Sequence, residues 1–308
     1  AVAGSVGGFS QSGSFTDQLV WFLARKGLHF STMVSCGNEC DLAAEDYLEY
    51  FGADENTKTI LAYMEGIKDG RRFFEVAREV AAKKPVIMWK GGMSEQGAKA
   101  AASHTGALAG SAAVWNALFQ QTGIINVTCM EQVVDCALAF ALSPLPKGFR
   151  TAVLSAHGGT GVGTADNCLT MGLELPGFAD ETKGRLRQIM PEVGTSIGNP
   201  VDIGVASLMN QGLYGEAIRI IADDPNIDMI LVNTSAIRAC EEGIVEASKT
   251  ITKPVVVSVF ALPELVPAEY AYLAENGIAA YPDAKRAAYA LSRLAGYAKF
   301  KADRESAG

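Results

Sequence analysis

The sequence predicts an α/β protein made of two duplicated domains, each with a doubly wound parallel sheet. First, short runs rich in Val, Ile and Leu alternate with helical segments along the chain. Second, these runs are continuously apolar, which is typical of parallel strands covered on both faces. Third, a pattern of strand, small polar turn and helix occurs twice, and 308 residues exceed what one core usually holds.

Five strands are predicted in the first half, and their order along the chain indicates a flavodoxin-like sheet. They are residues 4–10, 29–35, 58–64, 84–90 and 123–127. In the first helix, Phe15, Leu19, Phe22 and Leu23 recur at helical spacing and predict one buried stripe. Ligands of such folds bind beyond the carboxyl ends of the strands, so we expect a site at that edge.

The second half repeats the first with a growing offset. Ser10 to Gly13 aligns with Ala156 to Gly159 at an offset of 146, Gly37 and Asn38 align with Gly198 and Asn199 at 161, and Pro85 aligns with Pro254 at 169. Loop insertions in the second copy would produce this growth. Residues 142–150 form a linker with Pro and Gly, which predicts domains over 1–145 and 146–308.

Composition excludes several classes of function. The chain has 26 basic and 34 acidic residues and a net charge of -8, so we expect no nucleic-acid or anionic-membrane partner. Because it lacks a long apolar run and a signal-like start, we expect a cytoplasmic protein. The absence of an initiator Met suggests a fragment of a longer polypeptide. The six cysteines are scattered, and Cys36 and Cys40 lack further ligands nearby, so reduced thiols and no metal site are expected.

Two small polar turns between a strand and a helix each predict an anion site. The first reads SQSGS over 10–14, and the second reads AHGGTG over 156–161. Unpaired N–H groups lie there at the positive end of a helix dipole. Either turn alone can be explained by conformation, but two related by duplication favour one shared phosphate. GGTGVG also partly matches a dinucleotide fingerprint whose spacing fails at Thr164, so a nicotinamide oxidoreductase is a weaker alternative.

The two halves differ at His104 and Glu65. His104 lies in a run of small residues that has no counterpart in the second half, where Ser235 occupies the position of Glu65. Both follow strand ends, so we expect them to meet. A neutral imidazole nitrogen attacks phosphorus, while a carboxylate on the other ring nitrogen fixes the tautomer and stabilises the developing positive charge. The alternative is a structural loop histidine.

Several segments closely resemble the NDP-forming acyl-CoA synthetases, relatives of succinyl-CoA ligase. They are SQSGSF, SCGNECDL, TILAYMEGIKDGRRF, KKPVIMWKGG, GAKAAASHTGALAGS and SIGNPVDIG. The resemblance covers nearly the whole chain and implies a succinyl-CoA synthetase-like fold. It also implies that His104 carries a phosphoryl group between an acyl phosphate and a nucleotide, held by Glu65. Two helix N-termini cradle that group, and they map onto Ser12, Gly13, Ser14, Gly158, Gly159, Thr160 and Gly161.

The implied reaction is acyl-CoA, phosphate and NDP giving a carboxylate, CoA and NTP, reversibly. In the family, coenzyme A and ADP or ATP with Mg²⁺ are bound mainly by a Rossmann-like CoA-binding domain and an ATP-grasp domain. Neither is recognised in these 308 residues, so both are expected as partners in the same or another chain. Asn38, Lys90 and Asn199 are candidate contacts for substrate or CoA. An oligomer is expected.

Some alternatives stay open. His157 stands where relatives usually have a different residue before the glycine pair, so it either contacts the phosphate or fills space. A non-catalytic, acyl-CoA-sensing module, as in some protein acetyltransferases, is the second functional hypothesis. Glu65 and His104 favour the synthetase, because a sensor has no use for a phosphorylatable histidine. The sequence does not decide the acyl group, ADP against GDP, or whether the chain is a fragment or a separate subunit.

Overall fold

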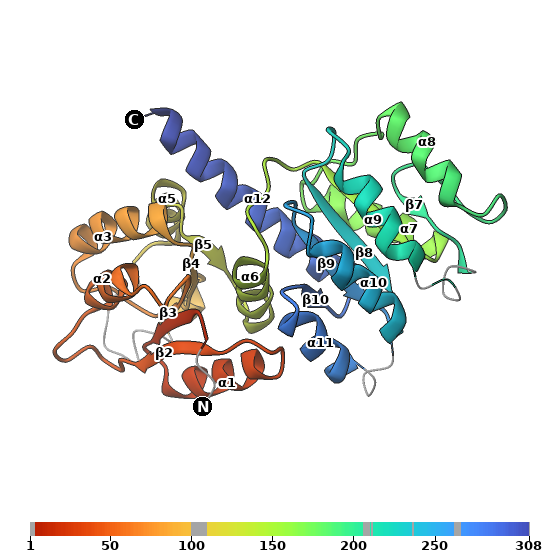
Figure 1. The fold of residues 1–308 in the computed structure, drawn as a ribbon. Helices are drawn as coiled ribbons and strands as arrows, with labels where there is room; N and C mark the ends of the chain where they lie inside the picture. Colours follow the sequence, from red (N-terminus) through yellow and green to blue (C-terminus); the bar gives the residue numbers. More distant parts are fainter. Residues whose placement is uncertain are drawn as a thin grey trace. The chain divides into compact units, whose positions relative to one another are not determined.

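A computed structural model describes residues 4–99, 110–205, 210, 212–235, 237–261 and 266–307. The chain divides into two compact units, Ala1–Ala141 and Leu142–Gly308. Each unit holds a five-stranded parallel sheet with helices on both faces (Figure 1). The prediction of two doubly wound α/β folds is therefore confirmed. His104 lies outside the described residues.

The sheet of unit 1 has the strand order β2-β1-β3-β4-β5. Its strands are β1 (Val6–Ser10), β2 (Phe30–Ser35), β3 (Thr59–Met64), β4 (Val86–Lys90) and β5 (Ile125–Val127). All five were predicted, but β1, β4 and β5 each begin two residues later than expected, and at β4 the reason is clear. Lys84 there still caps the preceding helix, and proline has no N–H to donate to a ladder.

The described helices of unit 1 divide between the two faces of this sheet. They are α1 (Gly13–Ala24), α2 (Ala44–Ala53), α3 (Gly70–Lys83), α5 (Ala112–Thr122) and α6 (Met130–Leu142). One core joins the sheet to α2, α3 and α5 through buried side chains such as Leu48, Phe73 and Trp115. On the other face Phe15 of α1 stacks on Tyr63 of β3 with ring centroids 4.7 Å apart. The stacking of Phe15 on Tyr63 therefore holds the start of α1 at the carboxyl edge of the sheet.

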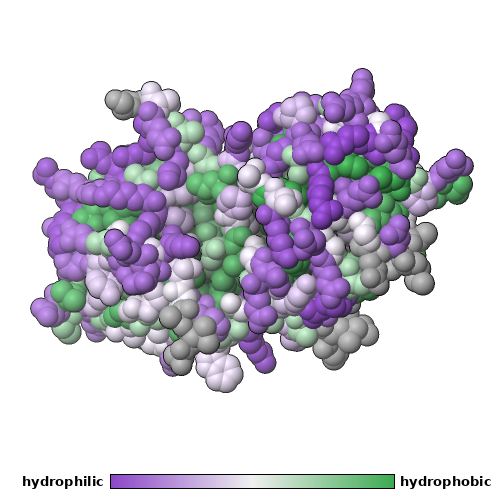
Figure 2. Space-filling view, viewed as in Figure 1, coloured by the Kyte–Doolittle hydropathy of each residue, from purple (hydrophilic) through white to green (hydrophobic). Residues whose placement is uncertain are grey.

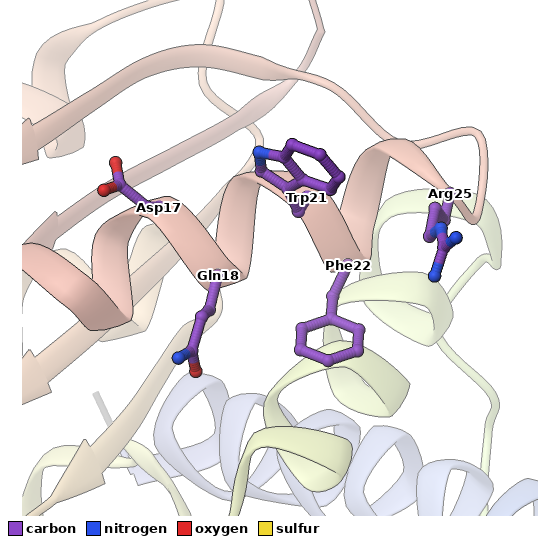
Figure 3. A pocket seen from close by; sticks show the side chains of 5 residues that line it. All are labelled: Asp17, Gln18, Trp21, Phe22 and Arg25. Atoms are coloured by element: carbon purple, nitrogen blue, oxygen red, sulfur yellow. The ribbon is translucent and has the colours of Figure 1, made fainter.

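The apolar stripe of α1 is narrower than predicted. Phe15, Leu19 and Leu23 are buried, but Phe22 is 47% exposed because it lies at the edge of the stripe. Together with neighbouring side chains of α1 it lines a pocket of about 350 Å³ (Figure 3). The lining residues are Asp17, Gln18, Trp21, Phe22 and Arg25. These follow the first turn of α1, so this pocket is separate from the predicted anion site.

Unit 2 repeats the same topology, with the order β10-β9-β8-β6-β7. Its strands are β6 (Thr151–Ser155), β7 (Val201–Asp202), β8 (Met229–Thr234), β9 (Val255–Val259) and β10 (Ala279–Tyr281). Its helices are α7 (Gly158–Thr170), α8 (Asp180–Ile189), α9 (Gly212–Ala222), α10 (Arg238–Ser248), α11 (Val266–Glu275) and α12 (Ala284–Ala307). One core joins the sheet to α8, α9, α10 and α11, while α7 packs against α12. Helix α8 is the insertion that enlarges the second copy.

Shared hydrogen-bond patterns identify equivalent residues in the two units. They correct two of the three sequence offsets predicted between the units. The N–H of Ser12 donates to the Ser10 hydroxyl at 3.0 Å, and the N–H of His157 donates to the Ser155 hydroxyl at 3.2 Å. The first turns therefore match at an offset of 145, not 146, and Gln11 corresponds to Ala156. The glycine pair of the second turn offers two partners for Gly13, which allowed the sequence alignment to slip by one position.

The Gly-Asn pairs are not equivalent either. The N–H of Cys36 donates to the Ser10 carbonyl, and that of Ile203 donates to the Ser155 carbonyl, both at 2.9 Å. Gly37 therefore corresponds to Gly204, at an offset of 167, and both adopt positive φ values of 52° and 72°. Asn199 instead precedes β7. The α8 insertion separates these positions, and the sequence did not reveal where it ends.

The third predicted offset is confirmed at the amino ends of the sheets. The N–H of Ile60 donates to the Pro85 carbonyl, and that of Ile230 donates to the Pro254 carbonyl, both at 2.9 Å. The lysine before each proline also makes the same contact. Lys84 Nζ donates to the Asp54 carbonyl at 2.7 Å, and Lys253 Nζ donates to the Asp224 carbonyl at 2.6 Å. The duplication therefore extends to side-chain contacts.

Polar residues cover much of the face shown in Figure 2, with apolar side chains in smaller areas between them. Even α12, which has 24 residues, carries lysine and arginine along its length. Within the described ranges, no helix is both long and apolar enough to cross a membrane.

Candidate active site

The start of α1 presents an electropositive turn at the carboxyl edge of the first sheet. Ser12 caps the helix by accepting a 3.4 Å hydrogen bond from the Phe15 N–H. Gly13 and Ser14 are exposed, and the first turn contains no acidic residue. An anion can therefore approach the first N–H groups of the helix without meeting a negative side chain of that turn.

The start of α7 has the same backbone but different side chains. His157 occupies the N-cap position, and its imidazole makes no capping hydrogen bond. Gly158 and Gly159 are exposed, whereas Gly161 is buried and donates its N–H to the His157 carbonyl at 3.0 Å. The predicted phosphate contact of the Gly161 N–H is therefore replaced by a bond within the helix. Gly158, Gly159 and Thr160 provide the first turn.

A carboxylate that the sequence reasoning missed lies beside this second turn. A Cβ atom on Gly158 would come within 2.8 Å of Asp202 Oδ2, at the end of β7. The other oxygen, Oδ1, accepts a 2.9 Å hydrogen bond from the Gly204 N–H. In unit 1 the corresponding position is Ser35, whose hydroxyl would be 3.7 Å from a Cβ on Gly13. The first helix start is therefore more favourable for an anion than the second.

Glu65 follows β3, and hydrogen bonds hold both its backbone and its carboxylate. Its N–H donates to Gln11 Oε1 at 2.6 Å, and its carboxylate accepts a 3.3 Å hydrogen bond from the Tyr63 hydroxyl. Burial raises the pKa of Tyr63 to about 12, and the nearby charge and hydrogen bond of Glu65 act in the same direction. Gly91 leaves space here, since a Cβ on it would be 2.8 Å from the Tyr63 hydroxyl. The half-buried carboxylate is thus fixed at the sheet edge.

Lys90 ends the neighbouring strand and is almost fully buried, with 2% exposure. Its ammonium group lies 5.1 Å from the centroid of the Trp115 ring and donates to the Gly91 carbonyl. Burial lowers its pKa to about 8, although attraction to Glu65 opposes this shift. Met64 pairs with Lys90 in the sheet, so the ends of β3 and β4 place a carboxylate and an ammonium group on adjacent strands.

We expect Lys90→Met to raise the free energy of unfolding by about 1–3 kcal/mol at pH 7, because it removes a buried charge. A lysine whose pKa is lowered on folding binds fewer protons in the folded state. Wild-type stability should therefore rise as the pH increases from about 8 to 10.5, and the variant should lose this rise. Urea unfolding at pH 7 and pH 10 measures both effects. An unchanged pH dependence in the variant would exclude Lys90 as its source.

The other predicted contacts fall in different places. Asn38 is exposed in the turn after β2, at the same edge as Glu65. The amide of Asn199 pairs with backbone groups instead: Oδ1 accepts from the Val153 N–H at 3.0 Å, and Nδ2 donates to the Thr151 and Pro176 carbonyls at 2.8 and 3.0 Å. Asn199 therefore stabilises β6 and is no longer favoured as a substrate contact. The expected approach of His104 to Glu65 lies outside the described residues and stays a prediction.

Comparison with known domain families divides the chain in the same manner as its fold. The profile of the succinyl-CoA ligase like flavodoxin domain matches residues 3–140. The profile of the ligase-CoA domain matches residues 151–305. Each profile therefore covers one of the two sheets and its helices.

Two similar proteins are longer than this chain. The alpha subunit of ADP-forming acetate–CoA ligase II from Pyrococcus furiosus is 38% identical, over 96% of this chain and 66% of that protein. ADP-forming acetate–CoA ligase I from Archaeoglobus fulgidus is 37% identical, over 97% of this chain and 43% of its own length. This chain thus spans about two thirds or less of the length of these relatives.

A solved structure shares the complete fold. It is the dinucleotide forming acetyl-coenzyme A synthetase 1 of Ca. Korarchaeum cryptofilum, in complex with phosphate and ADP. The match has a TM-score of 0.90 and 34% identity, and it covers 100% of this chain and 67% of that one.

Proposed function

The chain belongs to the NDP-forming acyl-CoA synthetase family, and we propose on this premise that it is the phosphoryl-transfer core of such an enzyme. The complete enzyme would interconvert acyl-CoA, phosphate and NDP with a carboxylate, CoA and NTP, with His104 carrying the phosphoryl group. One observation supports this most strongly. The carboxylate of Glu65 is fixed at the same sheet edge as an exposed helix start that has no acidic residue in its first turn.

The proposed chemistry needs two displacements at phosphorus. In the first, an imidazole nitrogen of His104 forms a bond to the phosphorus of an acyl phosphate as the bond to the carboxylate oxygen breaks. In the second, a terminal oxygen of NDP forms its bond to phosphorus as the nitrogen–phosphorus bond breaks. Glu65 would accept a hydrogen bond from the other ring nitrogen and stabilise the positive charge on the imidazole. The N–H groups of Gly13 and Ser14 would bind the phosphoryl oxygens.

Other components would come from outside the span of this chain. We propose that a Rossmann-like CoA-binding domain and an ATP-grasp domain, in the same or a partner chain, bind coenzyme A and nucleotide. Mg²⁺ would arrive with the nucleotide that the ATP-grasp domain binds. Asn38 and Lys90 remain candidate contacts at the sheet edge. Acetate, which the names of the relatives specify, is the first carboxylate to test.

We expect the chain to become phosphorylated when it is combined with those two domains and given Mg²⁺ and ATP labelled at the γ-phosphate. The label should be labile in acid and stable in base, because a phosphoramidate behaves in this way. Adding ADP should return the label to ATP, and omitting the ATP-grasp domain should prevent labelling. The sensor hypothesis predicts acyl-CoA binding without any label, so a chain that binds acyl-CoA but stays unlabelled would contradict the proposal.

A further inference from the structure

The side-chain amide of Gln11 clamps the backbone of Glu65 and Gly66. Its Oε1 accepts from the N–H groups of Glu65 and Gly66, at 2.6 and 3.1 Å. Its Nε2 donates to the Gly66 carbonyl at 3.0 Å and to Glu39 Oε1 at 2.9 Å. An amide offers two donors and two acceptor sites, so all of its hydrogen-bonding capacity is used. The backbone of Glu65 and Gly66 is therefore bound, through one side chain, to the residue that follows β1.

Glu39 helps to determine which way this amide points. Its side chain is 2% exposed, and its backbone adopts the left-handed region with φ of 56°, which is uncommon for a residue other than glycine. Lys68 Nζ donates to the Glu39 carbonyl and helps to hold that conformation. Burial raises the pKa of the Glu39 carboxyl, while the hydrogen bond from Gln11 and the charge of Lys68 act in the opposite direction. In its ionised form this carboxylate only accepts hydrogen bonds. A reversed amide would place Oε1 against this carboxylate and Nε2 against two N–H groups, so Glu39 and these N–H groups together select the observed orientation.

The second unit shows that the fold does not require this clamp. Ala156 occupies the position of Gln11, and its side chain has no polar atom. Ser235 occupies the position of Glu65. The serine turn, the strand pairing and the lysine contact at the opposite edge are nevertheless the same in both units. Among the described residues, the clamp therefore occurs in the unit whose sequence contains His104 and not in the other.

We propose that Gln11 is a positioning residue for Glu65, and that Glu39 orients the amide of Gln11 for this task. The inference rests on the proposed function, because Glu65 is useful only if its carboxylate faces the phosphorylated histidine. The Tyr63 hydroxyl holds the carboxylate itself, while Gln11 holds the backbone from which it extends. Without the clamp the carboxylate loses its fixed distance from the imidazole, and phosphoryl transfer depends steeply on such distances.

The test compares three variants in the labelling assay with the CoA-binding and ATP-grasp domains present. Gln11→Met removes all four hydrogen bonds at similar side-chain length and should slow labelling about 10- to 100-fold. The ATP concentration that gives half the maximal rate should not change, because ATP binds elsewhere. The acid limb of the pH–rate profile should shift to lower pH, as in Glu65→Gln, because a displaced carboxylate no longer favours the protonated imidazole.

The matched control is Thr57→Val. Thr57 is buried in the same unit at the opposite edge of the sheet, and its hydroxyl bonds to Ser31 and Asp54 at 2.7 Å each. This variant should lower the melting temperature at least as much as Gln11→Met, yet keep the wild-type labelling rate and pH profile. If it slows labelling equally and shifts the profile equally, general destabilisation explains both variants and the positioning role is wrong.

A charge swap tests the orientation of the amide directly. Gln11→Glu places two carboxylates together and should slow labelling about 10-fold or more. Adding Glu39→Gln supplies a donor to the new carboxylate and should restore the rate to within about 3-fold of wild type. A double variant no faster than Gln11→Glu alone would overturn the role of Glu39.

A wild-type rate and profile in Gln11→Met, with Glu65→Gln slow, would overturn the role of Gln11 alone. A wild-type rate in Glu65→Gln would instead refute the proposed function of Glu65, and this inference with it.

Discussion

Replacing His104 by alanine is expected to abolish the acid-labile label and to lower turnover of the reconstituted enzyme at least about 10³-fold. Alanine offers no nitrogen to bond to phosphorus, so the phosphoramidate cannot form at this position. Quantitative labelling with γ-labelled ATP, followed by steady-state synthesis of ATP from acetyl-CoA, phosphate and ADP, measures both losses.

The control for this variant is His29→Gln. His29 lies just before β2, at the amino edge of the first sheet, where the proposed chemistry does not occur. This variant should keep full labelling and turnover. Label of undiminished amount and the same acid lability in His104→Ala would show that another residue carries the phosphoryl group, and the proposed role of His104 would then be wrong.

Replacing Glu65 by glutamine should slow labelling about 10²-fold while the protein stays folded. Glutamine has the same shape, and its backbone N–H can still donate to Gln11, so the local structure should persist. The negative charge that stabilises the phosphorylated imidazole is lost. Single-turnover labelling measures the rate, and circular dichroism with thermal unfolding measures the fold.

Glu55→Gln is the appropriate comparison, since it removes the same charge from an exposed position before β3. We expect it to label at the wild-type rate. Equal slowing in both variants would indicate an effect of net charge on association with the other domains. Glu65 would then have no particular role in orienting the histidine.

The sequence was sufficient for the fold because each strand is a continuous apolar run, and such runs specify a buried parallel sheet. These apolar runs do not determine how the two halves align residue by residue. The turns at Gly13 and Gly158 contain several small residues each, so an alignment could move by one position without an apparent mismatch. Phe22 was assigned to the core for a similar reason: helical spacing places it near the stripe but does not show where the core ends.

The network around Glu65 could not be predicted for a different reason. Gln11 and Glu39 are 28 positions apart, and Gln11 and Glu65 are 54 apart. Their contacts depend on strand order and on the left-handed backbone at Glu39, neither of which has a local sequence signal. Asp202 was missed because its proximity to Gly158 follows from the pairing of β6 with β7. By contrast, Glu65 and Lys90 were found because both directly follow or end an apolar run.

The matching contacts of Lys84 and Lys253 show which edge of the sheet is the same in both units. The two units share the same lysine contact at the amino end of the sheet and differ at the carboxyl end, as Gln11 against Ala156 and Ser35 against Asp202 illustrate. In each unit, contacts that stabilise the sheet lie at its amino edge, and the residues that differ between the units lie at its carboxyl edge. Loops at the carboxyl ends of the strands are therefore the places to exchange when a new specificity is sought, because the lysine contacts at the amino ends stay intact.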